Sequence, residues 1–181
     1  MRKGKRTLKG LETVMENLNR EVQKIEGRTA EGMIQAAIIV ARDMETVPPK
    51  IPVDEGNLRA SRFIVSGKGE EQVPGQSKGS FRGEDGSTMQ SNHSTIVSKA
   101  RAVITASRYP QVIIGFSANY ARWVHEMDAS IATTPKSKGR KARKTERGFT
   151  RVGSGPKFFE AHWRNNEANI VRTIAKYAKI E

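Results

Sequence analysis

The chain has 181 residues, no cysteine and a formal net charge of +13. This length fits one domain, and the lack of cysteine excludes disulfide bonds and thiolate metal sites. The hydrophobic share of 36% is low for a compact domain and indicates a modest core with long solvated segments. No apolar run reaches membrane-spanning length or follows the charged N-terminus as in a signal peptide. We therefore expect a soluble protein made inside the cell, with no membrane contact.

The positive charge is concentrated in two segments. Residues 1–6 carry four of the excess positive charges and residues 136–151 carry seven, which leaves two for the rest of the chain. We therefore expect a nearly neutral folded body with a basic tail, 1–6, and a basic flexible loop, 129–155. Both segments are suited to binding nucleic acid or an acidic protein surface.

The N-terminal region predicts one long or once-broken helix from Thr7 to about Thr46. Its first half carries a narrow apolar stripe at spacings of three and four residues, formed by Leu8, Leu11, Met15, Leu18, Val22 and Ile25. We expect Thr7 to cap the helix, and Pro48 and Pro49 to end it. Two interpretations of the stripe remain open, namely packing within one subunit and packing on another subunit.

The middle of the chain predicts a small antiparallel sheet. Residues 62–65 have strand chemistry and follow one possible turn of helix at 58–61. Residues 67–94 are rich in Gly, Ser and charge, which predicts a long flexible loop. We expect residues 95–107 to be the strand returning from this loop, and residues 112–116 to be the next strand.

The segment 111–128 holds the densest apolar and aromatic content of the chain. A continuous apolar run is followed by a short helix with aromatic residues on one face. We expect this segment to anchor the core through Val112, Ile114 and Trp123. The rest of the short helix is expected at the edge of the core, where it meets a neighbouring subunit.

The last predicted helix begins at Pro156. Its apolar positions recur at helical spacing, with Asn166 completing the stripe, and are Phe159, Trp163, Ile170, Ile174 and Tyr177. The order of elements predicts an α+β fold in a single domain, 1–181. In this fold a long N-terminal helix and a C-terminal helix pack on a small antiparallel sheet, with two long mobile loops.

No residue pattern indicates catalysis. His93, His125 and His162 lack the spacing of a helical zinc site, and no phosphate-binding glycine motif occurs. Ser61 and Ser117 lie at predicted turn or cap positions, where capping is the simpler interpretation. We therefore expect no enzymatic activity, no metal and no cofactor.

The basic loop is the strongest functional candidate among the residues considered alone. Its cations are Lys136, Lys138, Arg140, Lys141, Arg143, Lys144, Arg147 and Arg151. They form either a solvated surface or a contact with phosphates or an acidic partner. Because Phe149 is the one nearby aromatic residue, any contact with nucleic acid is expected to be to the backbone and weakly specific. A small basic nucleic-acid-binding protein is thus one hypothesis.

Three short motifs occur in order along the chain. D-x-G-x-L-R-x-S spans 54–61, Y-A-x-x-V-H-E spans 120–126, and G-P-x-F-F spans 155–159. With the long helix before them and the two variable loops between them, they resemble the minor tail-component family of tailed bacteriophages, also called tail-completion or neck proteins. The resemblance covers about 32–178 without the loops. The chain departs from the family pattern at Glu55, where threonine is commoner.

The resemblance implies a structural virion protein of the head–tail junction, assembled in the host cytoplasm. It implies a homo-oligomeric ring, expected to be hexameric, of the tail-completion or tail-terminator type. Such a ring joins the tail tube to the head-closure proteins around the DNA channel. The basic loop then faces either the DNA, which it would contact non-specifically, or an acidic partner. The expected subunit-interface residues are Leu11, Met15, Leu18, Arg59, Tyr120, Arg122, His125 and Glu126.

Overall fold

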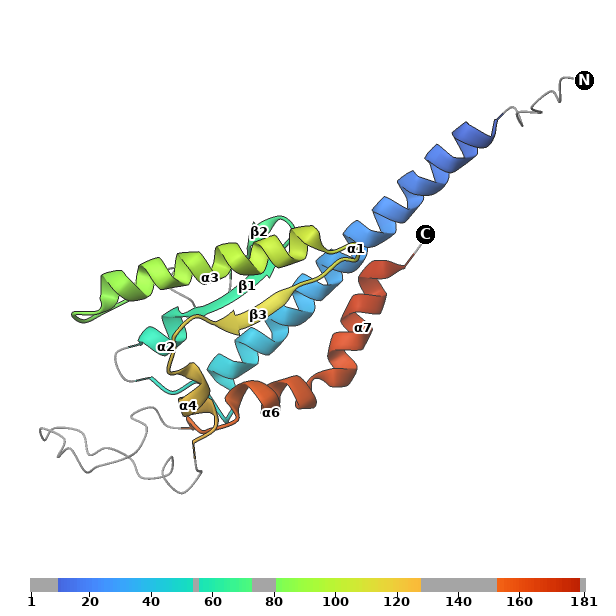
Figure 1. Cartoon of the computed structure of the whole chain (residues 1–181). Coiled ribbons are helices and arrows are strands. Elements are labelled where there is room, and N and C mark those ends of the chain that lie inside the picture. Colours follow the sequence, from blue (N-terminus) through green and yellow to red (C-terminus); the bar gives the residue numbers. More distant parts are fainter. Residues whose placement is uncertain (1–9, 54–55, 73–80, 128–152, 180–181) are drawn as a thin grey trace, which may run out of the picture.

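The computed structural model describes residues 10–53, 56–72, 81–127 and 153–179. The elements in chain order are α1 (Leu11–Thr46), α2 (Asn57–Ala60), β1 (Arg62–Ser66), β2 (Gly69–Glu70), α3 (Gly86–Ala106), β3 (Ile113–Phe116), α4 (Ala121–His125), α6 (Phe158–Asn165) and α7 (Glu167–Ala178). Long helices pack on a small antiparallel sheet (Figure 1), which confirms the predicted α+β class.

The sheet has the strand order β2-β1-β3, and both pairings are antiparallel. β1 is the central strand, with Ile64 opposite Ile114 of β3 and Val65 opposite Glu70 of β2. All of β1 is buried, because helices cover both faces of the sheet. The predicted strands 62–65 and 112–116 are confirmed to within a residue.

Side chains of β1 alternate between two apolar clusters. Ile64 packs with Val40 and Met44 on the face covered by α1. Phe63 and Val65 pack with residues of α3 on the other face. This alternation is the period of two that strand geometry imposes, and it places the sheet between α1 and α3.

The long helix α1 begins at Leu11, after Gly10 with a φ of 98°. Gly10 takes up the left-handed conformation that glycine tolerates at a helix boundary. Thr7 itself lies outside the described residues. The buried residues of α1 begin at Gly32, and the half before it projects away from the rest of the described chain (Figure 1).

The C-terminal region forms two helices where one was expected. The break is at Asn166, whose Nδ2 donates to Asp43 Oδ2 and to His162 O, each at 3.0 Å. Asparagine competes for backbone groups in this way and so favours helix ends. α7 then crosses α1 closely, since a Cβ on Gly32 would lie 2.9 Å from the Cα of Ile174.

The expected strand 95–107 is wrong, because these residues belong to the helix α3. Residues 86–94 are the first turns of the same helix, and β2 occupies two more positions of the expected flexible loop 67–94. Helical spacing explains the difference, since the side chains that face the sheet are His93, Ile96, Val97, Ala100 and Ile104. This spacing outweighs the strand preference of β-branched residues. The third strand of the sheet is β2.

The expected core position of Trp123 is also wrong, because its side chain is 78% exposed. Its helix, α4, is a short segment in which Tyr120, Ala121 and Val124 pack against the core. The side chain of Trp123 lies in solvent instead. Val112 and Ile114 do pack against the core, as expected.

Residues 153–157 lie beside the end of α1. Lys50 N donates a hydrogen bond to Gly153 O at 2.8 Å, and Lys50 forms a parallel bridge with Ser154. Further along, Lys157 N donates to His125 O at 2.8 Å. These bonds attach the start of α6 to both α4 and the segment after α1.

Candidate assembly surfaces

The residues expected at a subunit interface form two groups at opposite ends of the molecule (Figure 1). One group lies on the projecting half of α1 and consists of Leu11, Met15 and Leu18. The other lies around α2 and α4 and consists of Arg59, Tyr120, Arg122, His125 and Glu126. The structure therefore does not bring all these residues into one patch.

The apolar stripe on α1 is exposed. Leu11 is 53% exposed, Met15 49%, Leu18 55% and Val22 43%, and Val14 beside them is 61% exposed. No element among the described residues packs on this row. Single exposed apolar residues are common, but a continuous row of them marks an interaction surface. For the described part of the chain, the stripe is therefore not part of the subunit's own core.

The three motifs meet at the other end. Leu58 of the first motif, Val124 of the second and Phe158 of the third belong to one apolar cluster or pack against it. The ring of Phe158 lies edge-on to His125, with a centroid distance of 5.1 Å. Segments far apart in the sequence thus form one packed unit, in which most motif residues serve the fold.

Glu126 and His125 are engaged within the chain. The Glu126 carboxylate accepts hydrogen bonds from Lys157 Nζ and from His125 Nδ1, the latter at 2.7 Å. These bonds, that from Lys157 above all, hold the pKa of Glu126 below its usual value, and the carboxylate raises the pKa of Lys157. Because His125 Nε2 accepts from Glu160 N at 3.4 Å, the neutral tautomer with its proton on Nδ1 fits both contacts.

Arg59 belongs to an ion-pair cluster at the inner end of α1. Its Nε lies 2.9 Å from Glu45 Oε1, and Arg62 Nη1 lies 3.2 Å from the same oxygen. Arg62 is fully buried and donates to Ala41 O at 2.7 Å. Sequence reasoning missed Arg62 and Glu45, although a cation at the start of an apolar strand was a visible signal. The cluster ties Arg59 to its own subunit.

A chain of polar groups, in which His93 and Ser117 are buried and Glu70 is exposed, links α3 to the sheet. His93 Nδ1 lies 2.7 Å from Ser117 Oγ, and His93 Nε2 lies 3.4 Å from Glu70 Oε1. Serine, histidine and a carboxylate occur together in hydrolases. Here His93 is only 5% exposed and its ring is enclosed by Phe63 and Phe81. The arrangement therefore joins elements and gives a substrate no access.

A small cleft lies where the motifs meet. Its volume is about 250 Å³, and it is lined by Ile114, Gly115, Phe116, Ala121, Arg122, His125, Phe158 and Phe159. Small-molecule sites usually enclose roughly 300–1,000 Å³. An apolar cleft of this size, with two cationic or polar side chains at hand, suits one or two side chains of a protein partner better than a cofactor.

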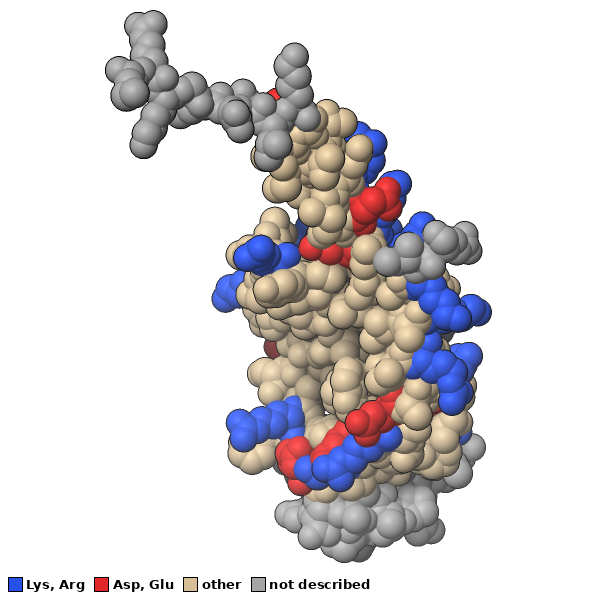
Figure 2. Space-filling view, turned by 90° about the vertical axis from the view of Figure 1, so that its right-hand side faces the viewer, with Lys and Arg blue, Asp and Glu red and all other residues tan. Residues whose placement is uncertain are grey.

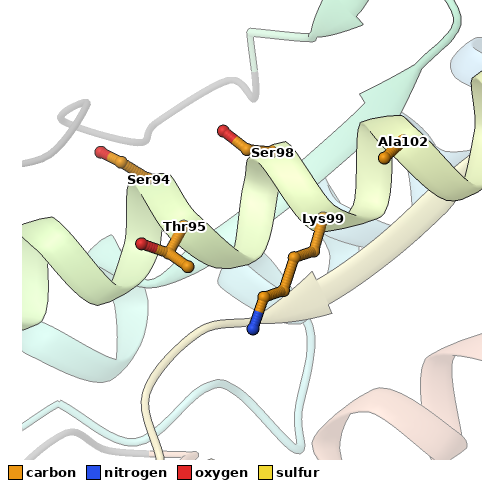
Figure 3. A pocket seen from close by; sticks show the side chains of 5 residues that line it. All are labelled: Ser94, Thr95, Ser98, Lys99 and Ala102. Atoms are coloured by element: carbon orange, nitrogen blue, oxygen red, sulfur yellow. The ribbon is translucent and has the colours of Figure 1, made fainter.

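Two other hollows lie along α3. The described residues that line the first, of about 460 Å³, all come from this helix, and Figure 3 shows them as Ser94, Thr95, Ser98, Lys99 and Ala102. The second, of about 640 Å³, continues along the same helix past Ser98. Short side chains of a single helix do not enclose a ligand, so neither hollow is a strong candidate site.

The described residues contain neither a metal-binding cluster nor a membrane-spanning helix. No group of three acidic or histidine side chains among them is arranged to hold a metal ion. Within the same residues, no helix combines the length and apolar character needed to cross a membrane. Figure 2 shows a face with a broad uncharged area in its middle. Lys and Arg side chains gather along one edge of it, and Asp and Glu side chains lie above and below it.

The expected basic contacts lie outside the described residues. They are Lys136, Lys138, Arg140, Lys141, Arg143, Lys144, Arg147 and Arg151, and the basic tail 1–6 lies outside them too. Comparisons of this chain with protein-family models, with curated proteins and with solved structures gave no match. A functional assignment therefore depends on the motifs and on the geometry given above.

Proposed function

We propose that this chain is a structural protein of the head–tail junction of a tailed bacteriophage. Its copies form a ring, expected to be hexameric, that joins the tail tube to the head-closure proteins around the DNA channel. It is of the tail-completion or tail-terminator type and performs no catalysis. It is assembled in the host cytoplasm and ends up in the virion.

The observation that carries the proposal is the exposed stripe on the projecting half of α1. Leu11, Met15, Leu18 and Val22 are about half exposed in a chain whose apolar content is low. Leaving a row of apolar side chains in water is unfavourable by roughly 25 cal/mol for each Å² that a partner could cover. Such a row supports a protein that assembles with others.

The kind of assembly is supported by the motifs. Those that resemble the phage tail-component family do not merely follow one another in sequence, since Leu58, Val124 and Phe158 share one apolar cluster. Residues at the motif positions thus have a common structural role. A family of ring-forming structural proteins fits this pattern better than an enzyme, because the buried His93 and Ser117 are shielded from any substrate.

Two measurements test the proposal. Native mass spectrometry and negative-stain electron microscopy of the purified chain should show a closed ring with a single symmetry. Antibody labelling of the phage that carries this gene should place the protein at the head–tail junction. Absence of the protein from the junction in intact virions would end the proposal, whatever the purified chain does.

The net charge of +13 supports a second candidate, a small basic nucleic-acid-binding protein. Filter-binding titrations over a range of salt concentrations separate the two functions. The second candidate predicts tight DNA binding by the monomer that weakens steeply with salt and is lost when residues 136–151 are deleted. The proposed ring protein should instead keep its ring after this deletion.

A further inference from the structure

The exposed stripe on α1 and the cleft beside α4 are complementary in shape. The stripe is on a projecting helix whose exposed residues 11–24 extend about 20 Å at the rise of an α-helix. The cleft is concave, apolar and about 250 Å³ in volume. Since a cavity of about 150 Å³ holds a benzene-sized group, the cleft has room for one or two stripe side chains.

Charge distinguishes between the partners that the stripe could take. Two carboxylates flank it at Glu12 and Glu26, and a third, Glu21, is bonded to Lys24. In a parallel pair of α1 helices, Glu21 of one copy would lie beside Glu26 of the other, because these are the positions that meet across a coiled coil. Like charges at these positions disfavour parallel pairing of α1 with itself.

The cleft offers the opposite charge. Arg122 lines it from the exposed side of α4, and its guanidinium has no ion-pair partner among the described residues. Glu12, at the outer end of the stripe, likewise has none within the described part of the chain. An apolar stripe edged by carboxylates therefore matches an apolar cleft edged by a guanidinium.

The two surfaces lie at opposite ends of the molecule (Figure 1). We infer that the outer half of α1 of one copy docks into the cleft between β3, α4 and α6 of the next copy. Because each copy then uses two different surfaces, the contact is heterologous and repeats until a ring closes. This inference deepens the proposed ring and rests on it for closure.

Complementation between two variants tests the contact. Leu18→Glu inactivates the stripe and leaves the cleft intact, whereas Ala121→Phe fills the cleft and leaves the stripe intact. Each variant alone should be monomeric in sedimentation velocity and native mass spectrometry. An equimolar mixture should give a one-to-one dimer and nothing larger, because one productive contact remains in each pair.

Controls keep the test decisive. Val103→Glu places the same charge on another exposed apolar position, 59% exposed on α3, and should leave assembly unchanged. If Ala121→Phe does not fold by circular dichroism, a charge exchange between the exposed Arg122 and Glu12 tests the contact instead. Arg122→Glu alone should weaken association several-fold, and adding Glu12→Arg in the same chain should restore it.

Several results would overturn the inference. These are a wild-type chain that stays monomeric over the whole concentration series, wild-type assembly of Leu18→Glu, and self-association of the cleft variants at wild-type strength. A Leu18→Glu protein that still forms rings removes this contact but leaves the proposed function standing. If the heterologous contact forms but the protein is absent from the head–tail junction, the inferred contact stands and the proposed function fails.

Discussion

Met44 and Met15 lie in the same helix, yet Met44 is fully buried and Met15 is 49% exposed. The inner half of α1 is covered by the sheet and by α6 and α7, and its buried positions form a broad face. The outer half has a narrow stripe and no covering element among the described residues. Apolar periodicity thus predicts that one face of a helix will be covered, but not by which element. In α1 the broad apolar face is covered within the chain, and the narrow one is not covered by any described element.

Substitution of charged residues should give the largest difference in lost stability between the two halves of α1. Glu45→Ala should destabilise the fold by about 3–5 kcal/mol, because it removes the Glu45 carboxylate that lies 3.2 Å from the buried Arg62 guanidinium. Glu16→Ala, in the exposed outer half, should change the free energy of unfolding by less than about 0.5 kcal/mol. Urea denaturation of both variants measures this. Equal losses of stability for the two variants would show that the ion-pair cluster does not stabilise the inner half of α1.

The two methionines give a matched apolar pair. Met44→Ala should cost about 2–5 kcal/mol, because the substitution leaves a cavity in the core beside Ile64. Met15→Ala should cost less than about 0.5 kcal/mol in the monomer. Chemical denaturation of monomeric protein tests the pair. A large loss for Met15→Ala would mean that the stripe is covered within its own chain.

Two glycines of α1 differ in how closely other elements approach their backbone. Gly32→Ala should destabilise by about 1–3 kcal/mol, because the added methyl would lie 2.9 Å from the backbone of Ile174 in α7. Gly27→Ala has nothing within 4 Å and should stabilise the helix by about 0.5–1 kcal/mol. Thermal unfolding of both variants should show shifts of opposite sign. Shifts of the same sign would contradict the close crossing of α1 and α7.

The smallest effect is expected at the exposed ion pair of the motif cluster. Since the folded state lowers the pKa of Glu126, its contribution is complete above the unfolded pKa, near 4.5, and is lost as the pH falls below that value. The stability difference between wild type and Glu126→Gln should therefore be present at neutral pH and shrink in acid. Melting temperatures over this pH range measure it. A difference that grows in acid would contradict the assigned direction.

The sequence was sufficient for elements whose patterns are long or bounded by turns. The end of α1 before Pro48, the strands β1 and β3 and the turn of helix α2 were predicted close to their observed positions. It misled where two signals competed. β-branched residues in 95–107 favoured a strand, but His93, Ile96 and Ala100 already had the spacing of one helical face.

The sites were less predictable than the elements. The bond between His93 and Ser117 joins residues 24 positions apart, and that between Arg59 and Glu45 joins residues 14 apart. Such pairs exist only after tertiary packing, so no local pattern reveals them. Trp123 shows the converse difficulty, because a single turn of helix is too short for its buried side to be read from periodicity.

Hydrogen bonds near α6 fix the chain on both sides of the basic segment. His125 O is bonded to Lys157 N, and Lys50 N to Gly153 O, so the fold holds together both sides of residues 128–152. Each doubling in the length of a flexible connection between fixed ends costs only about 0.6 kcal/mol. A flexible linker of another length or charge could therefore replace residues 128–152 without redesign of the core.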